Sequence, residues 1–230
     1  MIKANGQEQR RPSARARREA GAETRARIID AALDALRDEG YAGATARSIA
    51  TGGDFNPALI FYHFGGVDDL FLAALERTSV LRLERYRGAL QNVSGLADLI
   101  ATLRTLYAED VEAAHIAAVQ ELVAASAFST SMGPRIVALM QPWFAFSEEL
   151  IARILKGTAL EGMVSPADLA FAMVALYLGL ETMTRLTGGD PRRVRKLFSS
   201  AQRGAAIVEP LLGGRRRGAA ARAPAPVVLE

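Results

Sequence analysis

The chain has 230 residues, of which half are hydrophobic and 23% are charged. This composition provides ample side chains for a packed core and excludes a chain that is disordered throughout. The sequence contains no cysteine, which excludes disulfide frameworks, zinc sites built on thiolates and cysteine nucleophiles.

Secretory and membrane segments are not expected. The arginine-rich N-terminus has no apolar run behind it, and a secretory signal requires one. The longest apolar stretch, residues 169–180, is bounded by Asp168 and Glu181 and is shorter than the roughly 20 residues of a membrane span. We therefore expect a soluble, cytoplasmic protein.

The net charge of +3 is unevenly distributed. Residues 1–27 contain eight basic and three acidic side chains, and residues 213–230 contain four arginines and one glutamate. Residues 28–212 contain 16 basic and 21 acidic side chains, so the basic character lies at the two ends. We expect residues 1–22 to form a flexible basic arm and residues 213–230 a disordered basic tail, each either solvated or in contact with nucleic-acid phosphates.

The first predicted helix begins near Thr24, which can cap it, and ends at Gly40. A helix with a single apolar stripe needs a partner to cover that stripe. Here the apolar residues recur every three or four positions, at Ile28, Ile29, Ala32, Leu33 and Leu36.

Two short helices and a glycine turn follow. Residues 45–50 are predicted to be helical, residues 52–54 (Gly-Gly-Asp) form the turn, and residues 56–64 form a second helix that opens with Asn56 and Pro57. Two short helices joined by a tight turn are typical of the helix-turn-helix motif, whose second helix enters the DNA major groove. This stretch predicts a DNA-binding function.

The remaining residues also have helical patterns, so we expect an all-α protein. Pro142 predicts a kink or a break in one helix, and Ser165-Pro166 is a typical helix start. Neither strand alternation with hairpin turns nor an internal repeat is apparent in the sequence. The predicted helices cover about residues 68–90, 96–112, 115–129, 135–156, 166–186 and 191–212.

Residues 24–75 resemble the DNA-binding domain of the TetR family. The matching positions are Ile28, Ile29, Ala31, Ala32, Leu36, Gly40, Tyr41, Thr45, Ile49, Ala50, Gly53, Phe55, Asn56, Ile60, Phe61, Tyr62, His63, Phe64 and Leu70. The resemblance implies a transcriptional regulator, a repressor by expectation, that binds a palindromic operator as a homodimer and is released by a small-molecule effector. It also implies a three-helix DNA-binding domain over residues 23–67 and a helical ligand-binding and dimerisation domain over residues 68–212.

The candidate DNA-binding residues lie on the two short helices. The hydroxyl of Thr45 and the helix N-terminus can approach a phosphate, and Arg47 can reach a phosphate or a guanine edge. Apolar side chains in the groove can only contact a thymine methyl. The full set is Thr45, Arg47, Asn56, Pro57, Ala58, Leu59, Tyr62 and His63, whereas Ile49, Ile60, Phe61 and Phe64 are expected in the core.

Three positions depart from the usual residues of the family. Asp54 stands where glycine is usual, Ala58 where a small residue, often glycine, is usual, and Val67 where a lysine often meets a phosphate. Asp54 and Val67 both lower the expected affinity for DNA. Arginines of residues 1–22 can compensate by adding phosphate contacts.

The resemblance further implies an effector pocket within the middle helices. Most of the candidates are expected to be plain core residues, and a buried Glu121 would need a cationic or hydrogen-bonding ligand, Arg104 or Arg153 as its partner. The candidates are Tyr107, Gln120, Glu121, Phe128, Met140, Trp143, Phe144, Met173 and Tyr177, with His115 and Phe146 as further possibilities.

The resemblance implies that the last two helices form a homodimer interface. Independently, the apolar residues of residues 166–186 make a stripe that requires cover, next to a strip of small residues at Ala172, Ala175 and Gly179. A two-fold dimer would supply that cover, and burial inside a monomer is the alternative. The stripe consists of Leu169, Met173, Leu176, Leu180 and Met183.

Other functions have less support. The sequence has only two histidines and no recognisable phosphate loop, metal-ligand pair or catalytic set, so no catalytic residue, metal or cofactor is expected. The alternative function is a helical ligand-binding or interaction protein with weakened DNA binding, which Asp54 and Val67 suggest.

Overall fold

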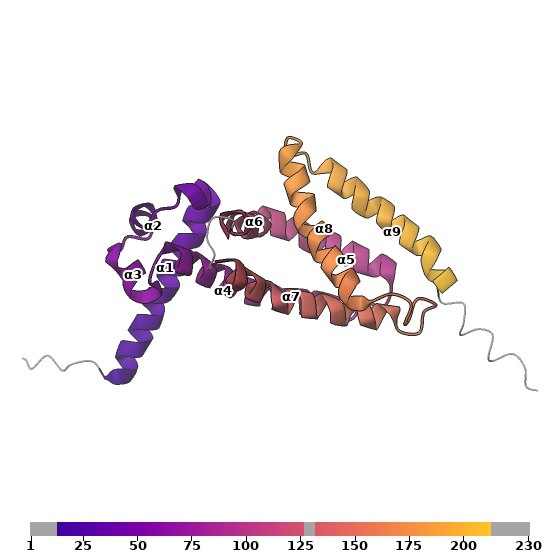
Figure 1. Ribbon diagram of the computed structural model, residues 1–230, viewed down its shortest axis with the longest axis horizontal. Helices are drawn as coiled ribbons and strands as arrows, with labels where there is room; N and C mark the ends of the chain where they lie inside the picture. Colours follow the sequence, from indigo (N-terminus) through magenta and orange to yellow (C-terminus); the bar gives the residue numbers. More distant parts are fainter. Residues whose placement is uncertain (1–12, 127–131, 213–230) are drawn as a thin grey trace, which may run out of the picture. The chain divides into compact units, whose positions relative to one another are not determined.

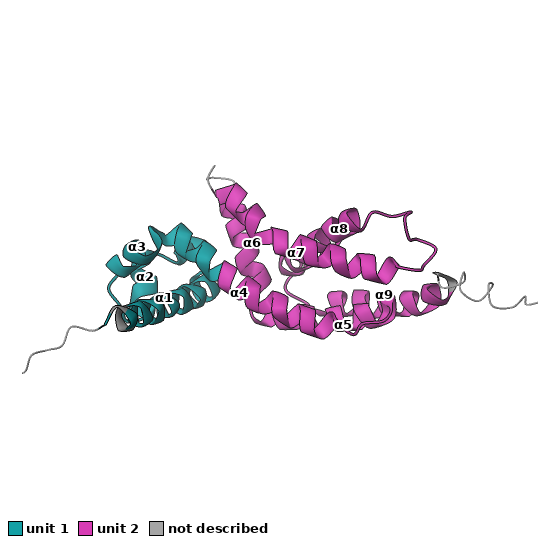
Figure 2. Cartoon of the chain, turned by 90° about the horizontal axis from the view of Figure 1, so that it is seen from below, with its two compact units in different colours: residues 1–75 teal, residues 76–230 magenta. Residues whose placement is uncertain are grey.

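The structure is a computed structural model that describes residues 13–126 and 132–212. Its described residues form helices and no strands, which confirms the all-α prediction (Figure 1). The chain divides into two compact units, residues 1–75 and residues 76–230 (Figure 2). Each unit has its own core.

Unit 1 contains α1 (Ala14–Gly43), α2 (Ala46–Gly52), α3 (Ala58–Phe64) and the first turns of α4 (Val67–Leu90). The apolar stripe of α1 is buried, and α2 packs against this helix. The first turns of α4 contribute buried residues as well, so unit 1 extends to Leu75, past the boundary expected at residue 67. The fully buried core residues of unit 1 are Ile28, Ala32, Ile49, Ile60, Leu70, Phe71 and Ala74.

The start of α1 differs from the prediction. Residues 14–22 were expected to belong to a flexible arm, but they are helical. Alanine, arginine and glutamate are strong helix formers, and Arg15 Nε donates a 2.8 Å hydrogen bond to Glu19 one turn later. Thr24 is therefore not a cap; its hydroxyl donates to the carbonyl of Ala20 inside the helix. Residues 1–12 of the expected arm lie outside the described residues.

Unit 2 contains the rest of α4 with α5 (Leu96–Glu112), α6 (His115–Ser126), α7 (Met132–Leu155), α8 (Pro166–Leu186) and α9 (Arg192–Leu212). Helix α7 packs along α8, and α5 packs along α9 (Figure 1). A core of Leu83, Tyr86, Leu90, Leu99, Leu106, Phe146 and Leu150 joins α4, α5 and α7.

Two further helix boundaries can be compared with the prediction. Helix α7 begins at Met132 and continues through Pro142, so the break that this proline could cause does not occur. Ser165 caps α8 as expected, because its hydroxyl accepts the Asp168 N–H at 3.2 Å. Residues 127–131 and the predicted tail, residues 213–230, lie outside the described residues.

The surface of α8 is unusually apolar. By length and composition alone, this 21-residue helix could cross a membrane, although the apolar run of residues 169–180 was too short to predict a span. Only 11% of its most apolar window is buried. However, α8 packs on α7 and carries an ion pair between Arg185 Nε and Glu181 Oε1 at 2.9 Å. We therefore interpret α8 as a helix of a folded domain with an uncovered apolar face.

Candidate nucleic-acid interface and ligand site

The N-terminus of α2 is closed by a reciprocal cap. Thr45 Oγ1 accepts the Ser48 N–H at 3.2 Å, and Ser48 Oγ accepts the Thr45 N–H at 2.9 Å. This capping box satisfies two backbone donors and leaves Thr45 and Arg47 exposed at the start of the helix. Both side chains are thus available to a phosphate backbone.

The turn between α2 and α3 depends on a close approach of the backbone at Gly53. A Cβ atom there would lie 2.3 Å from the ring of Phe55 and 2.8 Å from Cβ of Ala31. Such distances require glycine. Asp54, the next residue, has a φ of 50°, in the left-handed region that glycine adopts most easily and aspartate tolerates.

Helix α3 presents a short exposed row. Asn56 Oδ1 accepts the Ala58 N–H at 2.8 Å, as its predicted capping role requires, and Pro57 and Ala58 are exposed. Phe61 and Tyr62 follow one turn later with exposed fractions of 56% and 82%. Positions three and four apart share one face of a helix, so these residues form one exposed surface.

The structure corrects one prediction on α3: Phe61 was expected in the core but is exposed. Leu59, which was predicted to face the groove, is half-buried. The reason is the position of Ile60, which is fully buried and fixes the inward direction of this two-turn helix. Phe64, expected in the core, is half-buried. Phe61 has no hydroxyl, so it can offer DNA only apolar contact.

The C-terminal end of α3 is held by α1. Arg25 Nη1 donates a 2.9 Å hydrogen bond to the carbonyl oxygen of His63, and its guanidinium lies 4.1 Å from the ring centre of Phe64. Tyr62 and His63 are in edge-to-face contact, with ring centres 4.9 Å apart. These contacts orient α3 relative to α1 within unit 1.

Unit 2 contains a buried polar cluster contributed by several helices. Asp110 of α5 forms an ion pair with Arg82 of α4 and accepts hydrogen bonds from the hydroxyls of Tyr86, at 2.8 Å, and Tyr177 of α8. Asp110 is only 2% exposed. A buried carboxylate needs such partners, because desolvation of an unpaired charge is very unfavourable.

Two neighbouring polar atoms are buried, and both residues are 6% exposed. The Tyr107 hydroxyl and Glu181 Oε2 make no hydrogen bond of ordinary geometry among the described residues, although the Tyr107 hydroxyl lies close enough to Glu181 and Thr184 for both to affect its pKa. Tyr107 lies edge-to-face with Tyr177 at 5.2 Å and contacts Phe198 of α9 at 5.6 Å. Buried polar atoms without partners are uncommon and can mark a site where a ligand completes the contacts.

Burial keeps the tyrosines of this cluster and the nearby His115 uncharged. Desolvation raises the pKa of Tyr86 and of Tyr107 to about 12, and burial together with the Tyr86 neighbour raises the pKa of Tyr177 further. Burial and the charge of Arg82 lower the pKa of His115 to about 3. At neutral pH the tyrosines and His115 are therefore uncharged hydrogen-bonding groups.

Some predicted ligand residues lie in or next to this cluster. Tyr107 and Tyr177 belong to it, and Trp143 adjoins it, edge-to-face with Tyr86 at 5.1 Å while its Nε1 donates to Ser79 Oγ. Gln120 instead links α6 to α8, donating to Thr182 Oγ1 at 2.6 Å and to a backbone carbonyl.

The other predicted ligand residues are not brought to the cluster by any contact described above. Phe144 stacks on Phe171, and Phe128 lies outside the described residues. Glu121, Met140 and Met173 are half-buried. The two arginines considered as partners of Glu121 have other surroundings. Arg153 donates to the backbone carbonyls of residues 90 and 91, and Arg104 is exposed.

The sequence analysis missed Arg82, Asp110 and Glu181. One signal was available: Asp110 falls on the apolar stripe of α5, three residues after Tyr107 and four after Leu106. Among the described residues, no group of three histidine, aspartate or glutamate side chains could hold a metal ion.

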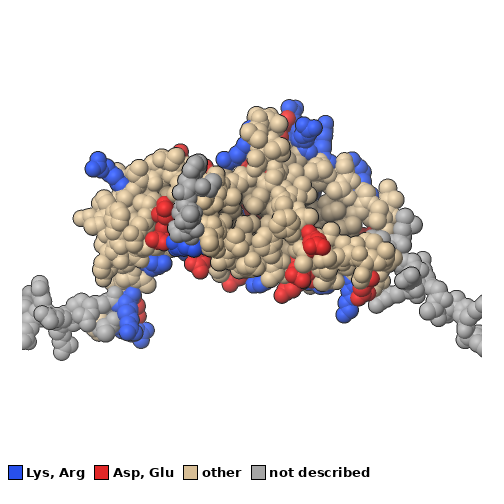
Figure 3. Space-filling model, in the orientation of Figure 1, with Lys and Arg blue, Asp and Glu red and all other residues tan. Residues whose placement is uncertain are grey.

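Helices α8 and α9 carry apolar side chains that the described chain does not cover. Of the stripe predicted on α8, Met173 and Leu180 are half-buried and the other three members are exposed. The exposed apolar residues of the two helices are Leu169, Phe171, Leu176, Met183, Leu186, Leu197, Ile207 and Val208. Charge is distributed differently: Lys and Arg gather over the beginning of α9 (Figure 3).

Comparisons with known proteins agree with this architecture. Residues 28–74 match the sequence profile of bacterial regulatory proteins of the tetR family. The chain is similar in structure to the fatty acid degradation regulator FadR from Bacillus halodurans, with a TM-score of 0.62 and 14% identity over 84% of this chain and 96% of that one. No curated protein matches the chain.

Two similar structures contain ligands. A candidate transcriptional regulator from Saccharomonospora viridis in complex with choline has a TM-score of 0.60 and 19% identity over 81% of this chain and 95% of that one. The multidrug binding protein EbrR complexed with proflavin has a TM-score of 0.52 and 26% identity over 77% of this chain and 98% of that one.

Proposed function

We propose that the chain is a transcriptional regulator of the TetR family, a repressor that binds a palindromic operator as a homodimer and is released by a small-molecule effector; the match of residues 28–74 to that family supports the proposal. The observation that carries the DNA-binding part is the exposed row on α3 behind the capped N-terminus of α2. Such a helix pair fits the major groove, with the second helix against the base edges.

The proposed DNA contacts divide by chemistry. Thr45, Tyr62 and His63 donate to phosphates, and these contacts set the register of the protein on the duplex. Arg47 and Asn56 supply the polar contacts that can distinguish bases, while Pro57, Ala58 and Phe61 offer apolar contact. Leu59 contributes at the edge of this surface, since it is half-buried.

The homodimer is proposed to form through α8 and α9. Their uncovered apolar side chains are the residues that a second copy would bury, and a two-fold interface uses the same patch on both subunits. The mass of the protein in solution tests this assignment. A monomeric mass at concentrations that retain operator binding would contradict it.

The effector is proposed to bind at the buried polar cluster of unit 2. Tyr107 and Glu181 each present a buried polar atom that makes no hydrogen bond of ordinary geometry among the described residues, and the rings of Tyr177 and Phe198 contact Tyr107. A ligand with a hydrogen-bond donor and an apolar body would complete these contacts. Screening a metabolite library by thermal shift identifies it, because a ligand that binds only the folded state raises the melting temperature.

Mobility shifts with duplexes from the DNA upstream of its own gene test the repressor proposal. Arg47→Ala and Tyr62→Ala should each weaken the complex, by about 1–3 kcal/mol where a bidentate base contact is lost. Arg104→Ala is the matched control, since Arg104 is an exposed arginine of unit 2. Binding that is indifferent to both variants would contradict the proposed docking.

A further inference from the structure

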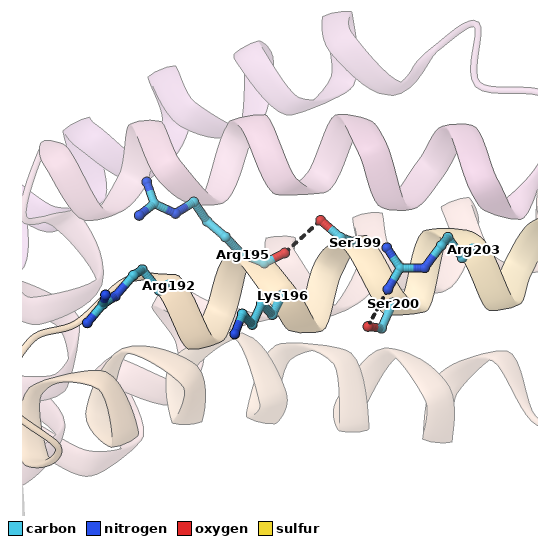
Figure 4. Close-up of a pocket in the computed structure, with 6 residues that line it drawn as sticks. All are labelled: Arg192, Arg195, Lys196, Ser199, Ser200 and Arg203. Carbon is cyan, nitrogen blue, oxygen red and sulfur yellow. Dashed lines mark hydrogen bonds between the residues drawn. The ribbon is translucent and has the colours of Figure 1, made fainter.

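One face of α9 forms a groove of about 550 Å³ whose lining is entirely basic or hydroxyl-bearing (Figure 4). The residues recur at intervals of three and four, which places them on one side of the helix. Val194 and Ala205 occupy the other side and are buried. The groove is lined by Arg192, Arg195, Lys196, Ser199, Ser200 and Arg203.

The charge of this groove contrasts with that of the chain around it. Residues 28–190 contain 11 basic and 20 acidic side chains, whereas residues 192–212 contain five basic side chains and one acidic. Some arginines elsewhere are paired, as Arg37 is with Asp34 and Arg85 is with Glu109. No described residue forms a hydrogen bond or an ion pair with the guanidinium of Arg195 or the ammonium of Lys196.

The position of these cations in α9 increases their attraction for an anion. Basic residues occupy the first two turns, where the helix dipole is also positive, and no acidic residue lies in the first turn. Like charges three and four residues apart also repel each other. An anion bound here would relieve both effects.

One carboxylate, that of Asp190, lies at the Arg192 end of the groove. Asp190 accepts hydrogen bonds from the backbone N–H of Arg192, at 2.9 Å, and from its Nε, at 2.9 and 3.0 Å. These bonds, with the charges of Arg195 and Lys196, lower the pKa of Asp190. Asp190 engages only the Arg192 end, so the charges of Arg195, Lys196 and Arg203 remain for a second anion.

We propose that this groove binds a phosphate group, carried either by a free phosphorylated molecule or by a lipid headgroup. Each guanidinium group, that of Arg195 and that of Arg203, can donate two parallel hydrogen bonds to the oxygens of a phosphate, and Lys196 adds a point charge. Ser200 Oγ accepts a hydrogen bond from Arg203 Nη2 at 3.0 Å, which leaves its own O–H to donate to the phosphate. The proposal does not depend on DNA binding or on the effector site.

Calorimetric titration of the full chain with inorganic pyrophosphate, against sodium chloride at equal ionic strength, tests the free source. Flotation with phosphatidylglycerol vesicles, against phosphatidylcholine vesicles, tests the lipid source. Arg195→Gln with Lys196→Gln should weaken binding at least about tenfold. Arg104→Gln with Lys156→Gln removes the same charge from exposed positions outside the groove and should leave binding unchanged.

The outcomes separate clearly. Binding to pyrophosphate or to phosphatidylglycerol vesicles that only the groove variant loses supports the proposal and identifies the source. No binding to either probe, or equal loss in both double variants, overturns it. Circular dichroism of both variants verifies that the helices are intact, and no DNA is present, so failure of the repressor proposal would not affect the result.

Discussion

The helix caps of unit 1 and the buried polar cluster of unit 2 are stabilised over very different distances along the chain. In unit 1 the caps of α2 and α3 close within three residues, between Thr45 and Ser48 and between Asn56 and Ala58, at an exposed surface. In unit 2 the buried Asp110 takes its hydrogen bonds from side chains 24 and 67 residues away. A surface built from local contacts tolerates change one residue at a time, whereas the buried cluster depends on the packing of three helices.

The largest expected effect is at the buried cluster. Asp110→Ala leaves the charge of Arg82 buried and uncompensated, so it should lower the free energy of unfolding by about 3–5 kcal/mol, measured by urea denaturation. Glu109→Ala, which removes the neighbouring but exposed partner of Arg85, should cost far less. If both variants lost the same stability, Asp110 would not be a buried ion-pair partner.

A second substitution should restore the stability that Asp110→Ala removes. The double variant Arg82→Met with Asp110→Leu replaces both charges by apolar groups and should recover most of the stability lost by Asp110→Ala. A double variant as unstable as the single one would show that the loss comes from packing and not from an unpaired charge.

The next largest effect concerns Gly53 of unit 1, where the backbone itself is tightly packed. Gly53→Ala should cost about 1–3 kcal/mol, because the new Cβ would overlap the ring of Phe55 and Cβ of Ala31. Gly52→Ala is the matched control, since a Cβ atom at Gly52 would meet nothing within 4 Å. Equal melting temperatures for the two variants would contradict the close approach at Gly53.

The pH dependence of stability should report the burial of His115. Its folded pKa, about 3, lies below its ordinary value of 6.5, so the unfolded chain binds a proton that the folded chain does not. The contribution of His115 to the free energy of unfolding is therefore present above pH 6.5 and is lost as the pH falls towards 3. Between pH 7 and 5.5 the free energy of unfolding should fall by about 1 kcal/mol. His115→Gln should reduce this loss in urea titrations, with His63→Gln as the control; an unchanged pH dependence would contradict the burial of His115.

The smallest effect is expected at the local cap. Thr45→Ala removes one half of the capping box and should cost about 1 kcal/mol, while Thr45→Ser keeps the hydroxyl and most of the stability. Thermal melts distinguish the two. A loss as large as that of Asp110→Ala would remove the contrast between local and long-range stabilisation.

The same contrast explains what could be predicted from the sequence. The capping residues Thr45 and Ser165, the Gly53 turn and the helical character of both units follow from spacing and local chemistry, and the structure agrees. Phe61 could not be placed correctly, because a two-turn helix gives too few residues to decide which aromatic side chain faces the core. Asp110 could be noticed from its place on the apolar stripe of α5, but its partners on α4 and α8 could not be predicted, because only the fold brings them to it.

The contact between Arg25 and α3 has a consequence for how DNA binding responds to salt. A protein that neutralises phosphates releases condensed counterions, about 0.9 per phosphate on duplex DNA, and the salt dependence of affinity measures their number. Arg25 is engaged by the His63 carbonyl and the Phe64 ring, so it is a structural cation that organises the recognition helix. Counting the arginines of unit 1 therefore overestimates the counterions released, and the affinity for DNA should be less sensitive to salt than the sequence suggests.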